Sequence, residues 1–450
     1  MRAGACAAVV LLIYLILAGR LAQLHWTSGP ELQRVASRQR IVHEVLPGRP
    51  GDIVDCRGVV LAASIETHSM FVVPRKLRDA DSTALLLASA LDLDPRALSE
   101  RISTHAAKGF LWVKRRISED EAARVRALGL PRDEWGFRQE FQRIYPQGLC
   151  AAQVIGVRDI DGTGRGGIEA AFDARLRGAP GRRELLQDAR GRVLEVRTGS
   201  EQPARHGETI RLTVDTYLQL QSERVLDEVM DEWKPRSSCA VVLDPQTGAV
   251  LAMASRPTFD PSHPERAPAN GWTNRVISDQ YEPGSTFKPM IVAWALEQGM
   301  IQRDEVFDCE LGEWRMGGRV LHDHHRYGAL SVSQILAKSS NIGMAKIGVR
   351  LTNPRLHDAA LAFGFGRRTG IELPAEEDGL VRPLKQWTRY STGSIPMGQE
   401  ISATPLQVAT AFATLANGGV LVSPHVVVTA DLGTASGTTP VLSQVIGAET

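Results

Sequence analysis

The feature that most constrains this chain is a Ser-x-x-Lys pair, Ser285 and Lys288, which leads directly into the apolar run Met290–Leu296. A run that is apolar on every side is typical of a helix buried in the centre of a domain. If the segment is helical, Ser285 and Lys288 lie on one face and the lysine can reach the serine hydroxyl. Such a hydroxyl becomes a nucleophile only beside a base, and a lysine acts as a base only when its pKa is lowered. The pattern therefore predicts a buried nucleophile and base, although a Ser-x-x-Lys pair by itself also occurs by chance.

The residues next to this pair predict that a helix begins at Ser285. Pro283 and Gly284 form a turn signal. Ser285 would then lie at a helix N-terminus, where the helix dipole favours developing negative charge. Pro289 disfavours helical dihedrals at Lys288, but it is tolerated in a first turn, whose N–H groups lack intrahelical partners.

A second signal is the triplet Ser339-Ser340-Asn341, which interrupts the helical pattern of Ser331–Leu351. The Ser339 hydroxyl could relay a proton between Lys288 and a leaving group. The Asn341 amide could hold both Lys288 and a substrate carbonyl, while Ser340 would face away. The triplet alone predicts no more than a break in a helix, but its position after the Ser-x-x-Lys pair strengthens the catalytic interpretation.

A third signal is the loop that contains Gly398 and Gln399. It precedes Thr404-Pro405, which opens the apolar helix Leu406–Ala416. Gly418-Gly419 ends that helix.

Composition excludes several classes of protein. The chain has 450 residues, which predicts two or three domains. Its net charge of +1 gives no indication of a nucleic-acid binder. The five cysteines are widely spaced without a C-x-x-C pair, so neither a zinc site nor a disulfide framework is indicated. His322, His324 and His325 could be metal ligands in principle, but adjacent histidines in a short loop rarely all face one ion. No metal and no cofactor are predicted.

The N-terminal segment Ala3–Gly19 is uncharged and mostly apolar, near the lower length limit of a membrane-spanning helix. A signal peptide is the alternative, but no clean small-x-small cleavage site follows. We therefore expect an uncleaved anchor over residues 1–24. Arginines on both sides leave the positive-inside rule ambiguous, and we expect the long remainder to be exported.

Two further regions follow the anchor. Residues 25–205 contain a hairpin around Arg57-Gly58, an apolar strand at Val154–Gly156, a helix from Gly167 to Leu176 and a basic hairpin at Gly178–Val196. A polar stretch at Thr198–His206 favours a boundary near residue 205.

The last region, residues 206–450, begins with a strand at Thr209–Asp215. It continues with the amphipathic helix Tyr217–Trp233 and the hairpin of Cys239–Leu243 with Ala249–Ala254. The apolar character of that hairpin predicts central strands of a sheet.

These segments resemble a class B penicillin-binding protein, since Ser-x-x-Lys with Ser-x-Asn is the signature of that superfamily. The resemblance covers nearly everything after the anchor, and the small pedestal is more similar to the division-specific septal enzymes than to the elongation enzymes. The segments that carry it are Gly51–Asp55 with Arg57-Gly58, Arg143–Pro146, Gly167–Glu169, Gly284–Pro289 and Lys338–Asn341.

The fold implied is a mixed α and β transpeptidase domain, with helices on an antiparallel sheet, carried by an extended pedestal with one N-terminal membrane helix. The resemblance implies that Ser285, Lys288, Ser339 and Asn341 are catalytic. It also implies that Gly284, Ser340, Gly398 and Gln399 bind substrate.

The sequence departs from the family at the third motif, Lys-Thr/Ser-Gly, because the last lysine is Lys385. In the family this motif binds the substrate carboxylate, and its strand supplies one of two oxyanion-hole amides. The loss of one such donor typically costs about 10²–10³ in rate. We therefore expect a C-terminally incomplete transpeptidase domain, poorly folded in its C-terminal half and weakly active.

The function implied is peptidoglycan cross-linking by a D,D-transpeptidase that passes through a serine acyl-enzyme in septal wall synthesis. The partners implied are stem peptides, β-lactams as inhibitors, the bacterial inner membrane, a membrane-embedded glycosyltransferase and other division proteins, without nucleic acid. One alternative is a D,D-carboxypeptidase or β-lactamase-type hydrolase. Another is a non-catalytic scaffold of the division machinery.

Overall fold

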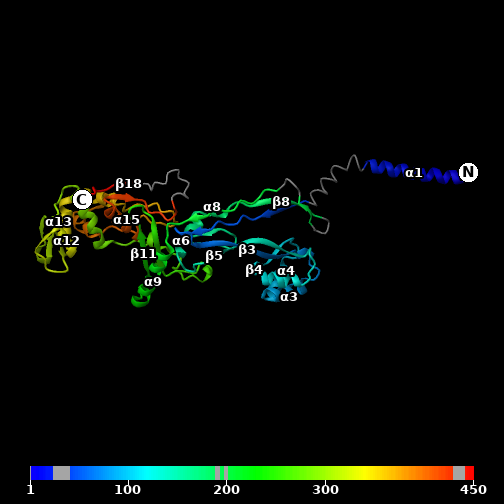
Figure 1. Cartoon of the computed structure of the whole chain (residues 1–450), viewed down its shortest axis with the longest axis horizontal. Helices are drawn as coiled ribbons and strands as arrows, with labels where there is room; N and C mark the ends of the chain where they lie inside the picture. The colour runs from blue at the N-terminus through cyan, green and yellow to red at the C-terminus, as the bar shows by residue number, and fades with distance from the viewer. Residues whose placement is uncertain (1, 24–40, 188–192, 197–200, 429–440) are drawn as a thin grey trace. The chain divides into compact units, whose positions relative to one another are not determined.

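The structure is a computed structural model that describes residues 2–23, 41–187, 193–196, 201–428 and 441–450 (Figure 1). Part of the predicted anchor and pedestal, residues 24–40, lies outside the described residues, as do residues 198–200 of the polar stretch near the predicted boundary. The chain forms two compact units whose segments alternate along the sequence. Unit 1 comprises Met1–Pro50, Ile65–Gln142 and Gly178–Gly207, and unit 2 comprises Gly51–Ser64, Arg143–Arg177 and Glu208–Thr450. The chain therefore enters unit 2 twice before the boundary that the sequence predicts near residue 205.

The N-terminal segment forms α1, Arg2–Gln23. Among the side chains that the structure describes, no helix combines the length and the apolar character needed to cross a membrane.

Unit 1 contains an antiparallel sheet in the order β1-β8-β9. Its strands are β1 (Ile41–Leu46), β8 (Gly181–Gln187) and β9 (Val193–Val196). The pairing of β8 with β9 confirms the predicted basic hairpin.

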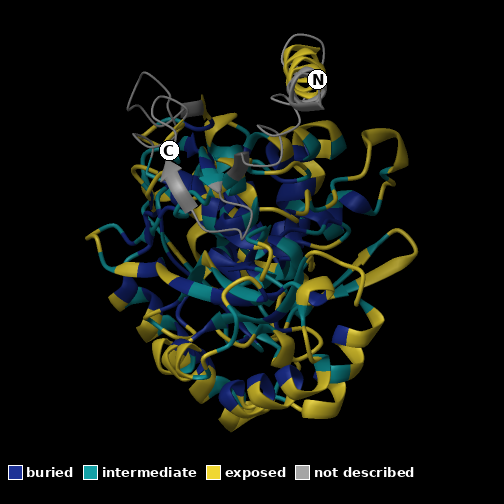
Figure 2. Ribbon diagram, turned by 90° about the vertical axis from the view of Figure 1, so that its right-hand side faces the viewer, coloured by how far each residue is buried: buried dark blue, intermediate teal, exposed yellow. Residues whose placement is uncertain are grey.

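The rest of unit 1 packs three helices against strands that pair with β3, and their shared core includes Met70, Leu87 and Leu98. Asp79 and Asp94 cap two of the helices, and the capping box of Ser118 and Glu121 starts the third. Buried and exposed residues alternate along such helices (Figure 2), because one face packs on a core and the other meets water. The elements are β3 (Val60–Val72), η2 (Pro74–Lys76), α3 (Ala80–Leu91), α4 (Pro95–Thr104), β4 (Leu111–Ile117), α5 (Glu119–Ala127) and β5 (Trp135–Ile144).

Unit 2 begins with β2 (Ile53–Val54), which pairs with the start of β3 on one side and with β10 (Ile210–Arg211) on the other. The pairing of β2 with β3 confirms the predicted hairpin around Arg57-Gly58. The predicted strand Thr209–Asp215 is reduced to β10, with an isolated bridge at Leu212.

Two predictions in the Arg143–Arg177 part of unit 2 are wrong. Val154 and Ile155 of the predicted strand are helical, because a fully buried apolar run does not distinguish helix from strand by its periodicity. The helix expected from Gly167 to Leu176 is interrupted at Phe172. The elements are α6 (Ala152–Ile155), β6 (Val157–Arg158), β7 (Gly164–Arg165), α7 (Gly167–Ala171) and α8 (Asp173–Arg177).

The predicted hairpin of unit 2 is confirmed as β11 (Ser238–Leu243) paired antiparallel with β12 (Val250–Arg256). Helices α9 (Thr216–Trp233), α10 (Arg275–Ser278) and α15 (Pro405–Ala416) contact these strands. Figure 1 shows α9 beside β11. Helices therefore pack on a β-hairpin, as expected for a domain with mixed helix and sheet content.

The larger core of unit 2 surrounds α11 (Lys288–Glu297), which buries Met290, Ile291 and Ala295. This confirms the buried helix expected after Ser285. The other elements are η3 (Pro264–Arg266), η4 (Gly284–Phe287), β13 (Val306–Asp308), η5 (Glu310–Gly312), β14 (Glu313–Met316), β15 (Arg319–His322), β16 (Ala329–Ser331), α12 (Val332–Lys338), α13 (Asn341–Ala362), η6 (Leu384–Gln386), α14 (Ser391–Ser394), η7 (Ile395–Met397), β17 (Val420–Val422) and β18 (Val441–Gln444).

Candidate active site

Ser285 lies on a tight turn that leads into the buried helix. The segment begins as the 3₁₀ turn η4 and continues as α11 from Lys288. The Gly284 N–H donates a hydrogen bond to the Gly398 carbonyl at 3.0 Å. A Cβ on Gly398 would lie 2.1 Å from the Gly284 oxygen, so only glycine allows this approach. Gly284 and Gly398 therefore fix the turn that carries Ser285.

Lys288 is 2% exposed and is surrounded by neutral acceptors. Its Nζ donates to the Ser339 carbonyl at 2.7 Å, to Ser339 Oγ at 2.9 Å and to Asn341 Oδ1 at 2.9 Å. Burial lowers the pKa of Lys288 to about 8, and the negative charge of Asp323 opposes that shift. The lysine is therefore able to lose its proton near neutral pH, as a general base requires.

Ser339 connects Lys288 to Ser285. Its hydroxyl donates to Ser285 Oγ at 3.0 Å. The described residues contain no direct hydrogen bond between Lys288 and Ser285, so the expected direct contact is replaced by a relay. Because a hydroxyl both donates and accepts, this chain can carry the Ser285 proton to Lys288 once Lys288 is neutral.

Asp323 holds the start of α13 and thereby the Asn341 side chain. Its carboxylate accepts hydrogen bonds from the N–H groups of Asn341 and Ile342 and from Ser340 Oγ. An acceptor at a helix N-terminus satisfies donors that have no intrahelical partner. Sequence reasoning missed Asp323, because a single aspartate among histidines belongs to no recognised motif. The available signal was an aspartate on a loop between a strand and the Ser-x-Asn triplet.

Ser340 does not face a substrate. It is fully buried, and its hydroxyl donates to Asp323 and accepts from the Gly343 N–H. This corrects the prediction that Ser340 binds substrate, because its hydroxyl is occupied in capping α13. That it faces away from Lys288 agrees with the sequence.

The loop after η7 brings Gln399 close to the turn of Ser285. The Glu400 N–H donates to Glu282 Oε1 at 2.9 Å, which connects this loop to the residues just before η4. Gln399 is exposed. Its role in substrate binding stays a prediction.

The histidines of the loop at residues 322–325 are not arranged as metal ligands. Within the described residues, no group of three histidine, cysteine or carboxylate side chains is arranged to hold a metal ion. The His322 carbonyl instead accepts from Asn341 Nδ2 at 3.2 Å.

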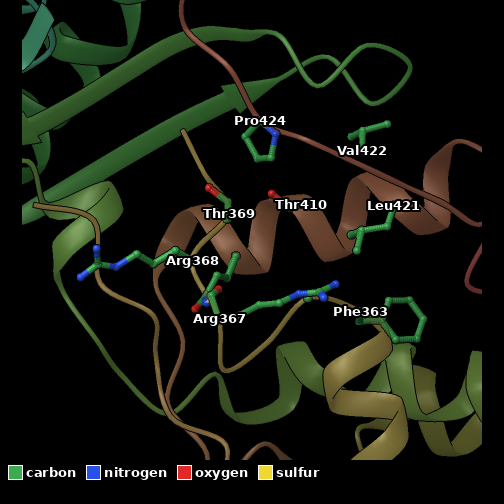
Figure 3. A pocket seen from close by; sticks show the side chains of 10 residues that line it. Phe363, Arg367, Arg368, Thr369, Thr410, Leu421, Val422 and Pro424 are labelled. Carbon is green, nitrogen blue, oxygen red and sulfur yellow. The ribbon is translucent and has the colours of Figure 1, made fainter. Parts of the chain in front are cut away.

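A separate small cavity lies between α15 and the loop of Arg367 and Arg368 (Figure 3). Its volume of about 20 Å³ is room for about one water molecule. None of the catalytic candidates lines it, so this cavity is not the active site.

Comparison with known families gives two matches that together span most of the chain. Residues 238–445 match the penicillin binding protein transpeptidase domain, and residues 45–212 match the penicillin-binding protein dimerisation domain. The chain is 31% identical over 424 residues to "Probable peptidoglycan D,D-transpeptidase PenA" of Neisseria meningitidis, covering 93% of this chain and 72% of that protein. It is 32% identical over 416 residues to "Peptidoglycan D,D-transpeptidase FtsI" of Escherichia coli K12, covering 91% and 70%.

The solved structures agree with this assignment. Penicillin binding protein 3 of Mycobacterium tuberculosis, complexed with aztreonam, is similar with a TM-score of 0.65 at 28% identity, over 90% of this chain and 73% of that one. The chain therefore belongs to the class B penicillin-binding proteins.

Proposed function

We propose that this protein is a peptidoglycan D,D-transpeptidase of septal cell-wall synthesis. Ser285 attacks the carbonyl of the penultimate D-alanine of a stem peptide. The bond to the terminal D-alanine breaks, and that residue leaves with a proton. The amine of a neighbouring stem peptide then attacks the acyl-enzyme, forms the cross-link and regenerates the Ser285 hydroxyl.

The observation that carries this proposal is the relay from Lys288 through Ser339 to Ser285. A buried lysine with neutral acceptors and a lowered pKa is a base, and Ser339 Oγ lies between that base and the nucleophile. Asn341 is bound to Lys288 by its amide oxygen and donates one amide N–H to the His322 carbonyl, so its second N–H is the donor available to a substrate carbonyl. β-Lactams would acylate the same serine.

We also propose that the apolar run Ala3–Gly19 anchors the chain as a single-pass helix, with the bulk on the extracytoplasmic face of the bacterial inner membrane. From the resemblance to the septal enzymes we also propose partners in the division machinery, including a membrane-embedded glycosyltransferase. Deletion of residues 1–24 tests the anchor: the shortened chain should leave the membrane fraction in high salt, and retention there would contradict it.

The experiment for the catalytic proposal is labelling with a fluorescent penicillin, followed by intact-mass spectrometry. The chain should acquire one adduct, and Ser285→Ala should acquire none while unfolding at the same temperature. Ser278→Ala is the matched control on a neighbouring serine and should label normally. The labelled fraction also measures the activity of a chain without a Lys-Thr/Ser-Gly triplet.

The non-catalytic scaffold predicts a different outcome. A scaffold would carry no adduct on the parent chain under conditions in which its fold is intact. A hydrolase would label but would release the adduct rapidly to water, so the lifetime of the acyl-enzyme separates it from a transpeptidase.

A further inference from the structure

Unit 2 contains a cavity of about 240 Å³ that the proposed reaction does not use. It lies where α6, the start of α7, the segment around α10 and the loop after Leu373 meet. The lining residues are Gln153, Gly166, Gly167, Trp272, Thr273, Asn274, Ile277, Ser278, Leu373, Pro374 and Ala375.

The lining of this cavity carries no charged side chain. Amides and hydroxyls alternate with apolar groups along its wall. An anionic or cationic ligand would lose its hydration here without an opposite charge, which is unfavourable. The cavity therefore favours a neutral ligand with several hydrogen-bonding groups.

Trp272 provides a flat apolar platform at this cavity. Its ring stacks on Phe259 with centroids 4.2 Å apart and an interplanar angle of 19°. Phe259 is buried, while Trp272 is 40% exposed. One side of the indole is therefore fixed in place by Phe259, which orients the ring in advance of any ligand.

One amide oxygen of the lining has no protein donor. Gln153 Nε2 donates to the Gly271 and Pro257 carbonyls, while Gln153 Oε1 makes no hydrogen bond within the described chain. Asn274 Oδ1 also has no partner, but it is closed off from the cavity and from solvent, and Asn274 Nδ2 donates to Met253 Sδ at 3.1 Å. An acceptor without a donor favours a ligand that presents an N–H or O–H group, so Gln153 Oε1 is the position that such a ligand can use.

We propose that this cavity binds an N-acetylated sugar ring of the peptidoglycan glycan strand, in addition to the stem-peptide site at Ser285. The N-acetylglucosamine ring of that strand is neutral, its C–H face can stack on Trp272, and its acetamide N–H or a hydroxyl can donate to Gln153 Oε1. The inference rests on the proposed function for the identity of the polymer. Asn274 lies eleven residues before Ser285 in the same unit.

The test uses the full chain in detergent micelles and strands of β-1,4-linked N-acetylglucosamine, because a glycan strand freed of its peptides by an amidase carries a lactyl carboxylate on every second sugar. Binding is measured by fluorescence anisotropy of end-labelled strands. Trp272→Ala should weaken binding about tenfold, the value of one buried ring face at ~25 cal/mol per Å². Trp272→Tyr, which keeps an aromatic platform, should recover most of the lost affinity, and Gln153→Leu, which removes the acceptor, should weaken binding severalfold.

Two controls make the outcome decisive. Trp233→Ala removes a tryptophan that is 73% exposed on α9, away from the cavity lining, and should bind normally. Ser285→Ala should also bind normally, so the strand-binding result can be interpreted even if the catalytic proposal fails. The proposal is overturned if the parent chain does not bind the strands, if Trp272→Ala binds like Trp233→Ala while melting normally, or if released stem peptides displace the strands.

Discussion

Two of the sites at which unit 2 buries positive charge treat that charge in opposite ways. Around Glu169, which is fully buried, the guanidinium groups of Arg143 and Arg158 donate to the two carboxylate oxygens at 2.6 and 3.0 Å. Around Lys288, every hydrogen-bond acceptor is a neutral carbonyl, hydroxyl or amide oxygen. The first site compensates its charges directly, and the second leaves its charge without a bonded carboxylate.

The difference separates a structural site from a chemical one. Arginine keeps its proton under all ordinary conditions, and Arg143 also donates to the Gly51 carbonyl and to Ser64 Oγ, which ties distant segments together. Lysine loses its proton readily when buried, and the pKa of Lys288 is lowered for that reason. Charge compensation at Glu169 thus stabilises the fold, whereas its absence at Lys288 produces a base.

Lys288→Arg should have the largest effect on acylation, because it puts a permanent charge in the position of the base. We expect the rate of penicillin acylation to fall by about 10²–10⁴, the usual contribution of a general base. Lys288→Ala should be nearly as slow. Stopped-flow acylation measures both, with Lys338→Arg, an exposed lysine on the neighbouring helix α12, as the matched control. An arginine variant within a few-fold of the parent chain would make Lys288 a positioning charge.

Glu169→Gln removes the compensating charge from the other site. Arg143 then faces a neutral amide, while Arg158 keeps its ion pair with Asp173, and the free energy of unfolding should fall by about 3–5 kcal/mol. Urea denaturation measures this loss. Glu208→Gln, which removes an exposed partner of Arg175, is the control and should change stability by at most about 1 kcal/mol. Equal losses in the two variants would contradict a structural role for the buried cluster.

The local part of the active site could be predicted from the sequence. Ser285 and Lys288 are three residues apart in one turn, and the apolar run after them specifies a buried helix. Ser339 and Asn341 were recognised because they are two residues apart at a break between helices. The structure brings all four together, as expected.

The parts that sequence reasoning missed depend on contacts between distant segments. Asp323 meets the start of α13 only because the β14–β15 hairpin folds back onto it. Ser340 was predicted to bind substrate because it lies between the two motif residues Ser339 and Asn341. Its burial depends on the loop of Asp323, which the motif does not include. The division of the chain into alternating segments also has no local signal, since Arg143 and Gly51 are far apart in sequence and joined only in space.

The smallest expected effect is a shift in the pH dependence of acylation. Burial places the pKa of Lys288 near 8, so neutral Lys288 declines below that pH and the rate should fall about tenfold per unit. Asp323 raises this pKa through its charge. Asp323→Asn should therefore move the midpoint of the profile to lower pH, because the protonated lysine loses the attraction of the Asp323 carboxylate. The amide also weakens the cap of α13, which lowers the maximum rate but leaves the midpoint as an independent readout. Asp304→Asn, an exposed aspartate of the same unit, should leave the midpoint unchanged. A midpoint that stays near 8 in Asp323→Asn, or moves upward, would mean that Asp323 acts on the helix start alone.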